Sequence, residues 1–192
     1  GVIECRLQNS RSAEQHLTRA LAAWQKVFGV RHPLVAAAFT NLAAVYHQEG
    51  DMERARECYG RAIEICESVL GPQHPWLCAL LSNVATFHMA QGRAAEAEPL
   101  FRRVVRIVEA AQGAHSPNLS VPLNNLATLY YNQANYRAAE PLYQRALAIQ
   151  QRNFGAEHPD TGLTCGNLAS LYTMQGQLRK AEPYYQRALR IL

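Results

Sequence analysis

Apolar residues recur along this chain at helical spacing, in pairs of amphipathic segments. Between residues 33 and 70, one such segment ends near Gly50 and a second ends at Gly71, as C-terminal cap glycines do. Asp51 stands between them, where its carboxylate can cap the second helix. Short links between amphipathic helices favour antiparallel pairs. Because strand signals are absent, the pattern predicts an all-α fold. The residues expected to face inward are Ala38, Phe39, Leu42, Ala43, Val45 and Tyr46 in the first helix, and Ala55, Tyr59, Ala62, Ile63 and Cys66 in the second.

The same pattern returns every 42 residues, which predicts a stacked repeat architecture. The repeated positions include an asparagine in each first helix and a glycine after each second helix: Asn41, Asn83, Asn125 and Asn167, and Gly29, Gly71, Gly113 and Gly155. We therefore expect residues 1–192 to form a single array. It would hold a partial repeat at 1–28 and repeats at 29–70, 71–112, 113–154 and 155–192. Because the chain begins and ends within helical patterns, we expect it to be a segment of a longer protein.

Small and large residues alternate at matched positions of the repeat, which predicts closely interlocked helices. The small residues are Ala43, Ala85, Ala127 and Ala169 in first helices, and Ala55, Ala97, Ala139 and Ala181 in second helices. The large residues are Tyr59, Phe101, Tyr143 and Tyr185. All of them are expected in the core.

The third full repeat departs from the pattern at two places. Ala134 stands where Gly50, Gly92 and Gly176 stand in other repeats. If the turn needs a left-handed backbone, Ala134 adopts it at a cost of about 1 kcal/mol, or Asn135 takes the strain instead. Residues 115–117 replace the His-Pro link and Pro122 adds a second proline, so we expect this first helix to start late or kinked.

The phrase Asn-Leu-Ala-x-Leu-Tyr, a Gln-Gly turn and then Ala-Glu-Pro-Leu-Tyr-x-Arg-Ala-Leu resemble the tetratricopeptide repeat. The 42-residue spacing and the Gly-x-x-His-Pro link are similar to the kinesin-light-chain subclass of that family. The resemblance covers the whole chain. It implies a right-handed superhelix of antiparallel helix pairs, with the first helices on the concave side. It also implies that asparagine at the repeated position grips the backbone of a peptide ligand.

One face of each first helix carries only small, amide, hydroxyl or apolar side chains and no charge. Small residues leave room for a guest chain, and an asparagine amide offers both a donor and an acceptor to an extended backbone. Alternatively, the repeated asparagines bond between neighbouring helices and support the stack. The predicted peptide-binding residues are Thr40, Asn41, Gln48, Ser82, Asn83, Thr86, Asn124, Asn125, Thr128, Asn132, Asn167 and Ser170.

The charge distribution argues against several ligand classes. The formal net charge is +4, but no run of like charges follows any segment. The uncharged face lacks the cations that a terminal carboxylate or a nucleic-acid backbone needs. A row of arginines in the second helices is expected to be solvated surface: Arg61, Arg103, Arg145 and Arg187. The alternative that the chain is an RNA-binding helical repeat is supported only by this row and by the net charge.

No motif predicts catalysis, a cofactor or a metal. No nucleophile, base and orienting group occur at a readable spacing, and no phosphate loop is present. The cysteines form no C-x-x-C pair and are odd in number, which favours reduced thiols in the cytoplasm. His32, His74 and His158 precede prolines and are expected to act in loops and caps. No membrane span or signal peptide is predicted.

The sequence therefore predicts a non-catalytic module that binds an extended or short helical segment of a partner protein. The alternative is a regulatory, assembly or oligomerisation segment of a larger multidomain enzyme or NTPase. In that case the chain would self-associate through its exposed last helix, around Tyr184 and Leu189.

Overall fold

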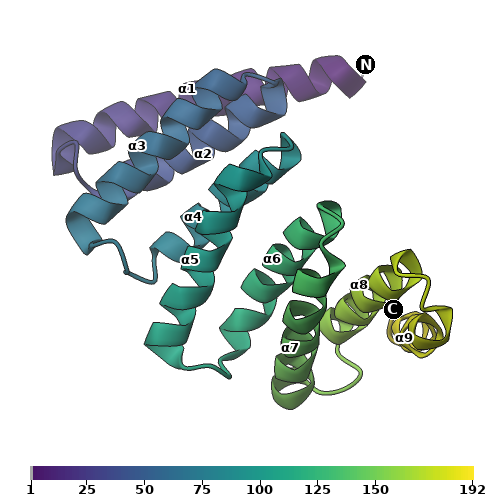
Figure 1. Ribbon diagram of the computed structural model, residues 1–192. Coiled ribbons are helices and arrows are strands. Elements are labelled where there is room, and N and C mark those ends of the chain that lie inside the picture. The colour runs from purple at the N-terminus through teal and green to yellow at the C-terminus, as the bar shows by residue number, and fades with distance from the viewer. Residues whose placement is uncertain (1) are drawn as a thin grey trace. The chain divides into compact units, whose positions relative to one another are not determined.

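The computed structural model describes the backbone of residues 2–192 and the side chains of residues 12–192. Within this range the chain is helical and contains no strand, so the all-α prediction is confirmed (Figure 1). Short turns connect the helices. In chain order these are α1 (Val2–Phe28), α2 (Pro33–Glu49), α3 (Met52–Leu70), α4 (Leu77–Ala90), α5 (Ala94–Gln112), the 3₁₀ turn η1 (Pro117–Leu119), α6 (Ser120–Asn132), α7 (Tyr136–Phe154), α8 (Pro159–Met174) and α9 (Leu178–Ile191).

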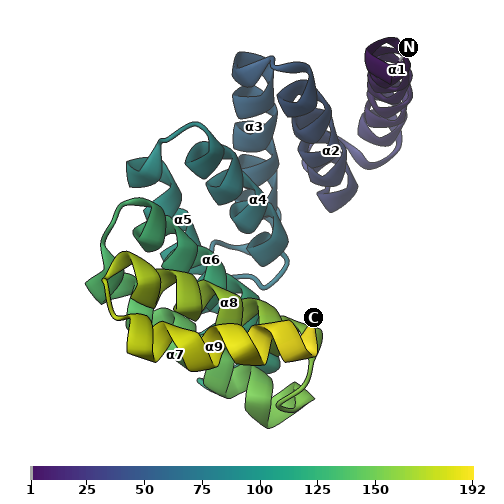
Figure 2. The same cartoon turned by 90° about the vertical axis from the view of Figure 1, so that its right-hand side faces the viewer.

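The chain divides into two compact units, Gly1–Phe87 and His88–Leu192, and the boundary falls inside α4. In the first unit α2 packs antiparallel to α3, and α1 covers the other side of α2 (Figure 2). In the second unit α6 pairs with α7 and α8 pairs with α9 in the same way (Figure 1). Each pair matches one predicted repeat.

Histidine caps explain where several first helices begin. The Nδ1 atoms of His32, His74 and His158 each accept a hydrogen bond from the backbone N–H two residues later, at 3.2 Å. This confirms that His32 and His158 cap α2 and α8, whereas His74 bonds within the loop before α4 begins at Leu77. Ser116 holds the same place in the third full repeat, where its hydroxyl oxygen accepts from the N–H of Asn118 at 3.2 Å. The cap is thus kept by a different side chain.

The first helix of the third full repeat starts late, as predicted. The 3₁₀ turn Pro117–Leu119 comes first, and α6 then begins at Ser120. In the last repeat α8 begins directly at Pro159, the counterpart of Pro117. Pro122 lies within the first turn of α6, where its missing N–H costs nothing.

The predicted core is confirmed at the small positions and at most of the large ones. The eight alanines in the two series are all buried. Tyr59, Phe101 and Tyr143 are buried as well, but Tyr185 remains 46% exposed on α9. Its assignment to the core is wrong, because a residue at this position is buried only where another element covers its helix.

Ala134 adopts the left-handed backbone that the sequence suggested. Its φ is +56°, close to the +73° of Gly176 at the same turn of the next repeat. Asn135 has an ordinary φ of −84° and caps α7 with its side chain, so the alternative that it takes the strain is wrong. The Cβ of Ala134 therefore crowds its own backbone.

We expect Ala134→Gly to stabilise the protein. Glycine removes the left-handed strain, although the more flexible unfolded chain offsets part of the gain, which leaves up to about 1 kcal/mol. Such a gain raises the melting temperature of a protein of this size by about 2–4 °C. Thermal unfolding followed by circular dichroism measures it, and an unchanged or lowered melting temperature would contradict the prediction.

Candidate functional site

The structure places the predicted peptide-binding residues on the first helices of their repeats. We call these residues, taken separately in each of the two units, the ladder face. All of them are exposed or half-buried, so none is closed off in the core. They lie on α2 (Thr40, Asn41, Gln48), α4 (Ser82, Asn83, Thr86), α6 (Asn124, Asn125, Thr128, Asn132) and α8 (Asn167, Ser170).

The four repeated asparagines keep their amides available. The side chains of Asn41, Asn83, Asn125 and Asn167 make no hydrogen bond to any residue that the structure describes. The alternative in which these amides support the stack through hydrogen bonds therefore has no such bond in the structure. A buried amide without hydrogen bonds would lower the stability of the fold, but these four amides are exposed or half-buried and can bond to water.

Asn124, next to Asn125, makes an inter-repeat bond that the four repeated asparagines (Asn41, Asn83, Asn125 and Asn167) lack. Its Nδ2 donates to Oγ1 of Thr164 on α8 at 2.8 Å. Thr164 is buried, and Oδ1 of Asn124 is buried without a partner. Asn124 was predicted to contact a ligand, and the structure gives it a role between α6 and α8.

The hydroxyl of Thr128 is also engaged within the protein. It donates to the backbone carbonyl of Asn124 and lies 2.9 Å from the hydroxyl of Tyr143. In the first unit, Thr40 similarly donates to the carbonyl of Ala36 at 2.9 Å. These threonines contribute small surface to the ladder face, while the asparagines hold its unused hydrogen-bonding groups.

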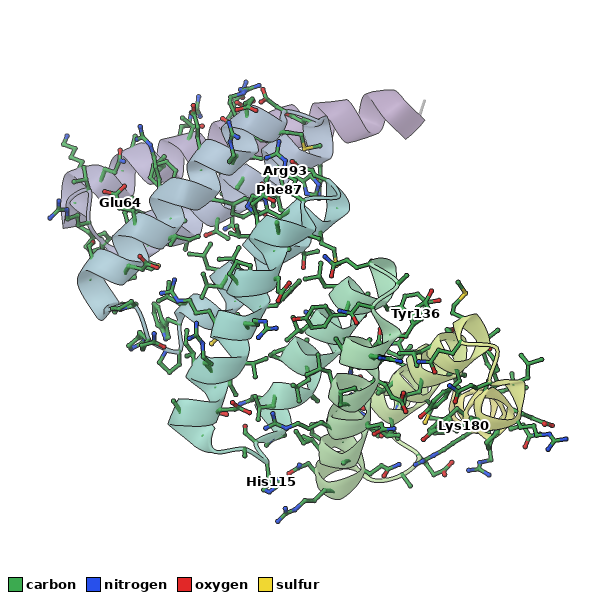
Figure 3. The ribbon with its side chains drawn as sticks, in the orientation of Figure 1. Glu64, Phe87, Arg93, His115, Tyr136 and Lys180 are labelled. Atoms are coloured by element: carbon green, nitrogen blue, oxygen red, sulfur yellow. The ribbon has the colours of Figure 1, made fainter. Side chains whose placement is uncertain are left out.

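Beside the ladder face, the ring of Tyr131 at the end of α6 packs against that of Tyr136 at the start of α7. The two ring centroids are 5.7 Å apart, and Figure 3 labels Tyr136 at this turn. The contact fixes Tyr131 at the edge of the α6 surface. Its ring adds aromatic surface next to Asn132.

Tyrosine–glutamate pairs connect consecutive repeats, and sequence reasoning missed them. A tyrosine near the end of a first helix donates to a glutamate 32 residues earlier, on the preceding second helix. The three bonds are Tyr46 to Glu14 at 2.9 Å, Tyr130 to Glu98 at 2.7 Å and Tyr172 to Glu140 at 2.9 Å. We call them rungs. The available signal in the sequence was a glutamate 32 residues before each of these tyrosines. In the repeat where His88 replaces the tyrosine, Arg56 replaces the glutamate.

Burial raises the pKa of the rung tyrosines. In Tyr130 and Tyr172 desolvation has the largest effect on the pKa, and the hydrogen bond to the rung carboxylate raises it further. The folded state therefore holds these protons more tightly than the unfolded state, in which tyrosine titrates near pH 10. Their contribution to stability is complete below about pH 10 and is lost as the pH rises toward the folded-state pKa.

We expect Tyr172→Phe to weaken the loss of stability between about pH 9 and pH 11, because phenylalanine has no proton to lose. Urea unfolding at a series of pH values measures the slope of the free energy of unfolding against pH. Tyr185→Phe is the control, because hydrogen bonds to Thr173 and Ser170 lower the pKa of Tyr185. Equal slopes for the parent and Tyr172→Phe would show that this rung does not titrate with unfolding.

Two arginines of the repeated row are fixed to the protein, which corrects the expectation of solvated surface. Arg145 donates to the carbonyl of Ala114 at 2.9 Å and forms an ion pair with Glu109 at 2.5 Å. Arg187 donates to the carbonyl of Ala156 at 3.0 Å. Each guanidinium thus fastens the loop 31 residues earlier. These bonds give the 42-residue spacing of Arg145 and Arg187 a structural role.

Three pockets are lined by residues outside the ladder face. One of about 710 Å³ surrounds the α2–α3 turn and is lined by Glu14 and residues 49–54. A second of about 300 Å³ lies beside Val30 and Arg61. A third of about 400 Å³ lies between α5 and α6, in the second unit. None of the three is lined by a residue of the ladder face.

The described residues do not suggest metal or thiol chemistry. No group of three or more metal-ligating side chains occurs among residues 12–192. Cys58, Cys66, Cys78 and Cys165 are free, and burial raises the pKa of each thiol, which lowers its reactivity. Cys5 lies outside the described side chains. No helix of the described chain has both the length and the apolar character needed to cross a membrane.

Comparison with known proteins matches this architecture. A family model described as "Tetratricopeptide repeat" matches residues 1–68, 35–86, 76–152 and 121–192. The crystal structure of BtubC (BKLC) from P. vanneervenii is 27% identical, with a TM-score of 0.85, over 95% of this chain and 73% of that chain. Kinesin light chain nearly identical TPR-like repeats from Podosopora anserina are 24% identical, with a TM-score of 0.78, over 98% of this chain and 94% of that chain. No curated protein matches the sequence.

Proposed function

We propose that this chain, which belongs to the tetratricopeptide repeat family, binds a segment of a partner protein on its ladder face and has no catalytic role. Tetratricopeptide repeats are in general scaffolds for protein–protein interaction. The observation that carries the proposal is the set of repeated asparagine amides without hydrogen-bond partners. The partner segment would be extended or a short helix, and the free, reduced cysteines support a cytoplasmic location.

The second unit contains two adjacent ladder positions on which binding can be tested. Asn125 on α6 and Asn167 on α8 are half-buried, so a peptide can reach their amides without unfolding the helices. Each amide can donate to a peptide carbonyl and accept from a peptide N–H. Ser170 and Gly166 beside Asn167 are small and leave space for the guest backbone. Because these residues carry no charge, binding should depend only weakly on salt.

Selection of random displayed dodecapeptides against the whole chain tests the proposal. At least one class of the selected peptides should lose about tenfold or more in affinity for the double variant Asn125→Ala with Asn167→Ala, because both backbone contacts are removed. Asn153→Ala is the matched control, since Asn153 is exposed and donates only to the carbonyl of Ile149 in its own helix. Fluorescence anisotropy gives the affinities, and circular dichroism checks the fold.

Two results would overturn the proposed role of the ladder face. One is a selection that yields no binding peptide. The other is a selection in which every binding peptide binds the double variant as tightly as the parent. For the peptides that depend on Asn125 and Asn167, a steep loss of affinity with added salt would separately contradict an uncharged binding surface.

Self-association through α9 is a second candidate, favoured by an exposed apolar stripe. Leu189 is 85% exposed, and Leu178 and Leu192 at the two ends of α9 are exposed as well. Tyr184, which was expected to join this surface, instead stacks on Tyr172 with ring centroids 5.7 Å apart. Light scattering after size exclusion distinguishes a monomer from a dimer. A dimer that Leu189→Gln converts to a monomer would support this candidate, and a monomeric parent would exclude it.

A further inference from the structure

The pocket between α5 and α6 is lined by apolar carbon and by two arginines. Its volume is about 400 Å³, within the range of ligand-binding pockets. Leu126 of α6 is buried at its floor, and Val105 of α5 is half-buried beside it. The other lining residues are Pro99, Arg102 and Arg106.

Comparison with the next repeat shows why a pocket forms here. The position of Val105 is taken by Leu147 in α7, which is buried. Valine is one methylene shorter than leucine, so less of the space between the two helices is filled. The positions of Arg102 and Arg106 are taken by Gln144 and Ala148. Compared with the next repeat, the pocket thus has a smaller side chain at Val105 and longer, cationic side chains at Arg102 and Arg106.

The two arginines differ in their partners. Arg102 lies in an ion pair with Glu98 at 2.9 Å and donates to the hydroxyl of Tyr130 at 2.6 Å. The rung between Tyr130 and Glu98 therefore fixes the direction of Arg102 and balances its charge. Arg106 has no ion pair or hydrogen bond with any residue that the structure describes. Its guanidinium keeps all its donors available at the edge of an apolar pocket.

We propose that the α5–α6 pocket binds a segment of another polypeptide in which a leucine-sized aliphatic side chain lies next to a carboxylate. The aliphatic side chain fills the space between Val105 and Leu126 that leucine fills in the next repeat. The carboxylate meets Arg106, which offers the charge-assisted donors that a planar anion prefers. Complementary charge and shape both select this occupant.

The chemistry of the pocket disfavours a nucleic acid. Binding a phosphate backbone takes a run of cations along its path, and single-stranded bases stack on aromatic side chains. Here Glu98 balances one of the two arginines, and the lining between them is aliphatic. None of the residues that line the pocket belongs to the ladder face, so this site is additional to the proposed peptide-binding surface.

The same random dodecapeptide library tests this site when the selected clones are measured on different variants. Val105→Leu fills the pocket with the residue of the next repeat, and Arg106→Gln removes the available charge. We expect one class of clones to carry an aliphatic residue beside Asp or Glu. These clones should lose about tenfold or more in affinity for each variant and should bind more weakly as salt is added.

Two controls separate this site from the rest of the surface. Arg190→Gln makes the same charge change at the position that corresponds to Arg106 in the last repeat, and it should leave the affinity unchanged. The double variant at Asn125 and Asn167 should also bind these clones as the parent does. The two proposals can therefore fail separately. Circular dichroism confirms that Val105→Leu and Arg106→Gln remain folded.

The proposal is overturned if no selected clone loses affinity for both Val105→Leu and Arg106→Gln. It is also overturned if Arg190→Gln weakens the same clones equally, because binding would then follow net charge. The assigned occupant would also be contradicted if a single-stranded RNA of twelve nucleotides bound the pocket more tightly than every acidic clone.

Discussion

Tyr143→Ala is expected to lower the free energy of unfolding by about 3–5 kcal/mol, as truncation of a buried aromatic residue does. Tyr143 is 2% exposed on α7, and its hydroxyl lies 2.9 Å from that of Thr128 on α6. Alanine would leave a cavity between the two helices and remove a hydrogen bond from Thr128. Urea unfolding followed by circular dichroism measures the change.

The repeat supplies a matched control 42 residues later. Tyr185 occupies the same position on α9 but is 46% exposed, so Tyr185→Ala should cost less than about 1 kcal/mol. The comparison keeps the residue type and the repeat position, while the burial of the ring differs. Similar losses for the two variants would mean that burial by the neighbouring helix does not set the energy.

Gly162→Ala is expected to destabilise the protein by about 1–3 kcal/mol, as overpacking of a filled site does. Gly162 is buried on α8. A Cβ at this position would lie 2.9 Å from Cγ2 of Ile191 and 3.1 Å from Cγ of Leu192. The end of α9 would have to move away. Urea unfolding gives the global loss, and amide hydrogen exchange in α9 shows whether its last turn opens.

Gly166 is the control for this substitution, one helical turn further along α8. A Cβ built there meets no atom within 4 Å, and its backbone is helical. Gly166→Ala should therefore stabilise the protein by about 0.5–1 kcal/mol, because alanine loses less backbone entropy in a helix. A loss of stability at Gly166, or a gain at Gly162, would contradict the packing seen around these two residues.

Single positions show how far sequence reasoning reached into the site. The asparagines of the ladder were found because they recur in phase, and they lie on accessible helix surface. The separate role of Asn124 was not found, because its partner Thr164 lies 40 residues away and has no counterpart in the other repeats. The rungs were missed for a related reason. The buried position of a tyrosine ring follows from periodicity, but the direction of its hydroxyl does not.

The sequence by itself determined the repeat, its helix pairs and their caps, and it identified the turn at Ala134 and Asn135 as a position of possible strain. These features depend on contacts within a few residues, where helical periodicity and the conformational limits of proline, glycine and alanine decide the outcome. Only the tertiary structure decided which equivalent positions are buried, as Tyr143 and Tyr185 show. It also decided that Arg145 and Arg187 donate to loop carbonyls and that a pocket forms beside Val105, where the next repeat has a leucine. Those properties depend on what the adjacent helix places opposite each side chain, and the residue's own position in the repeat does not contain that information.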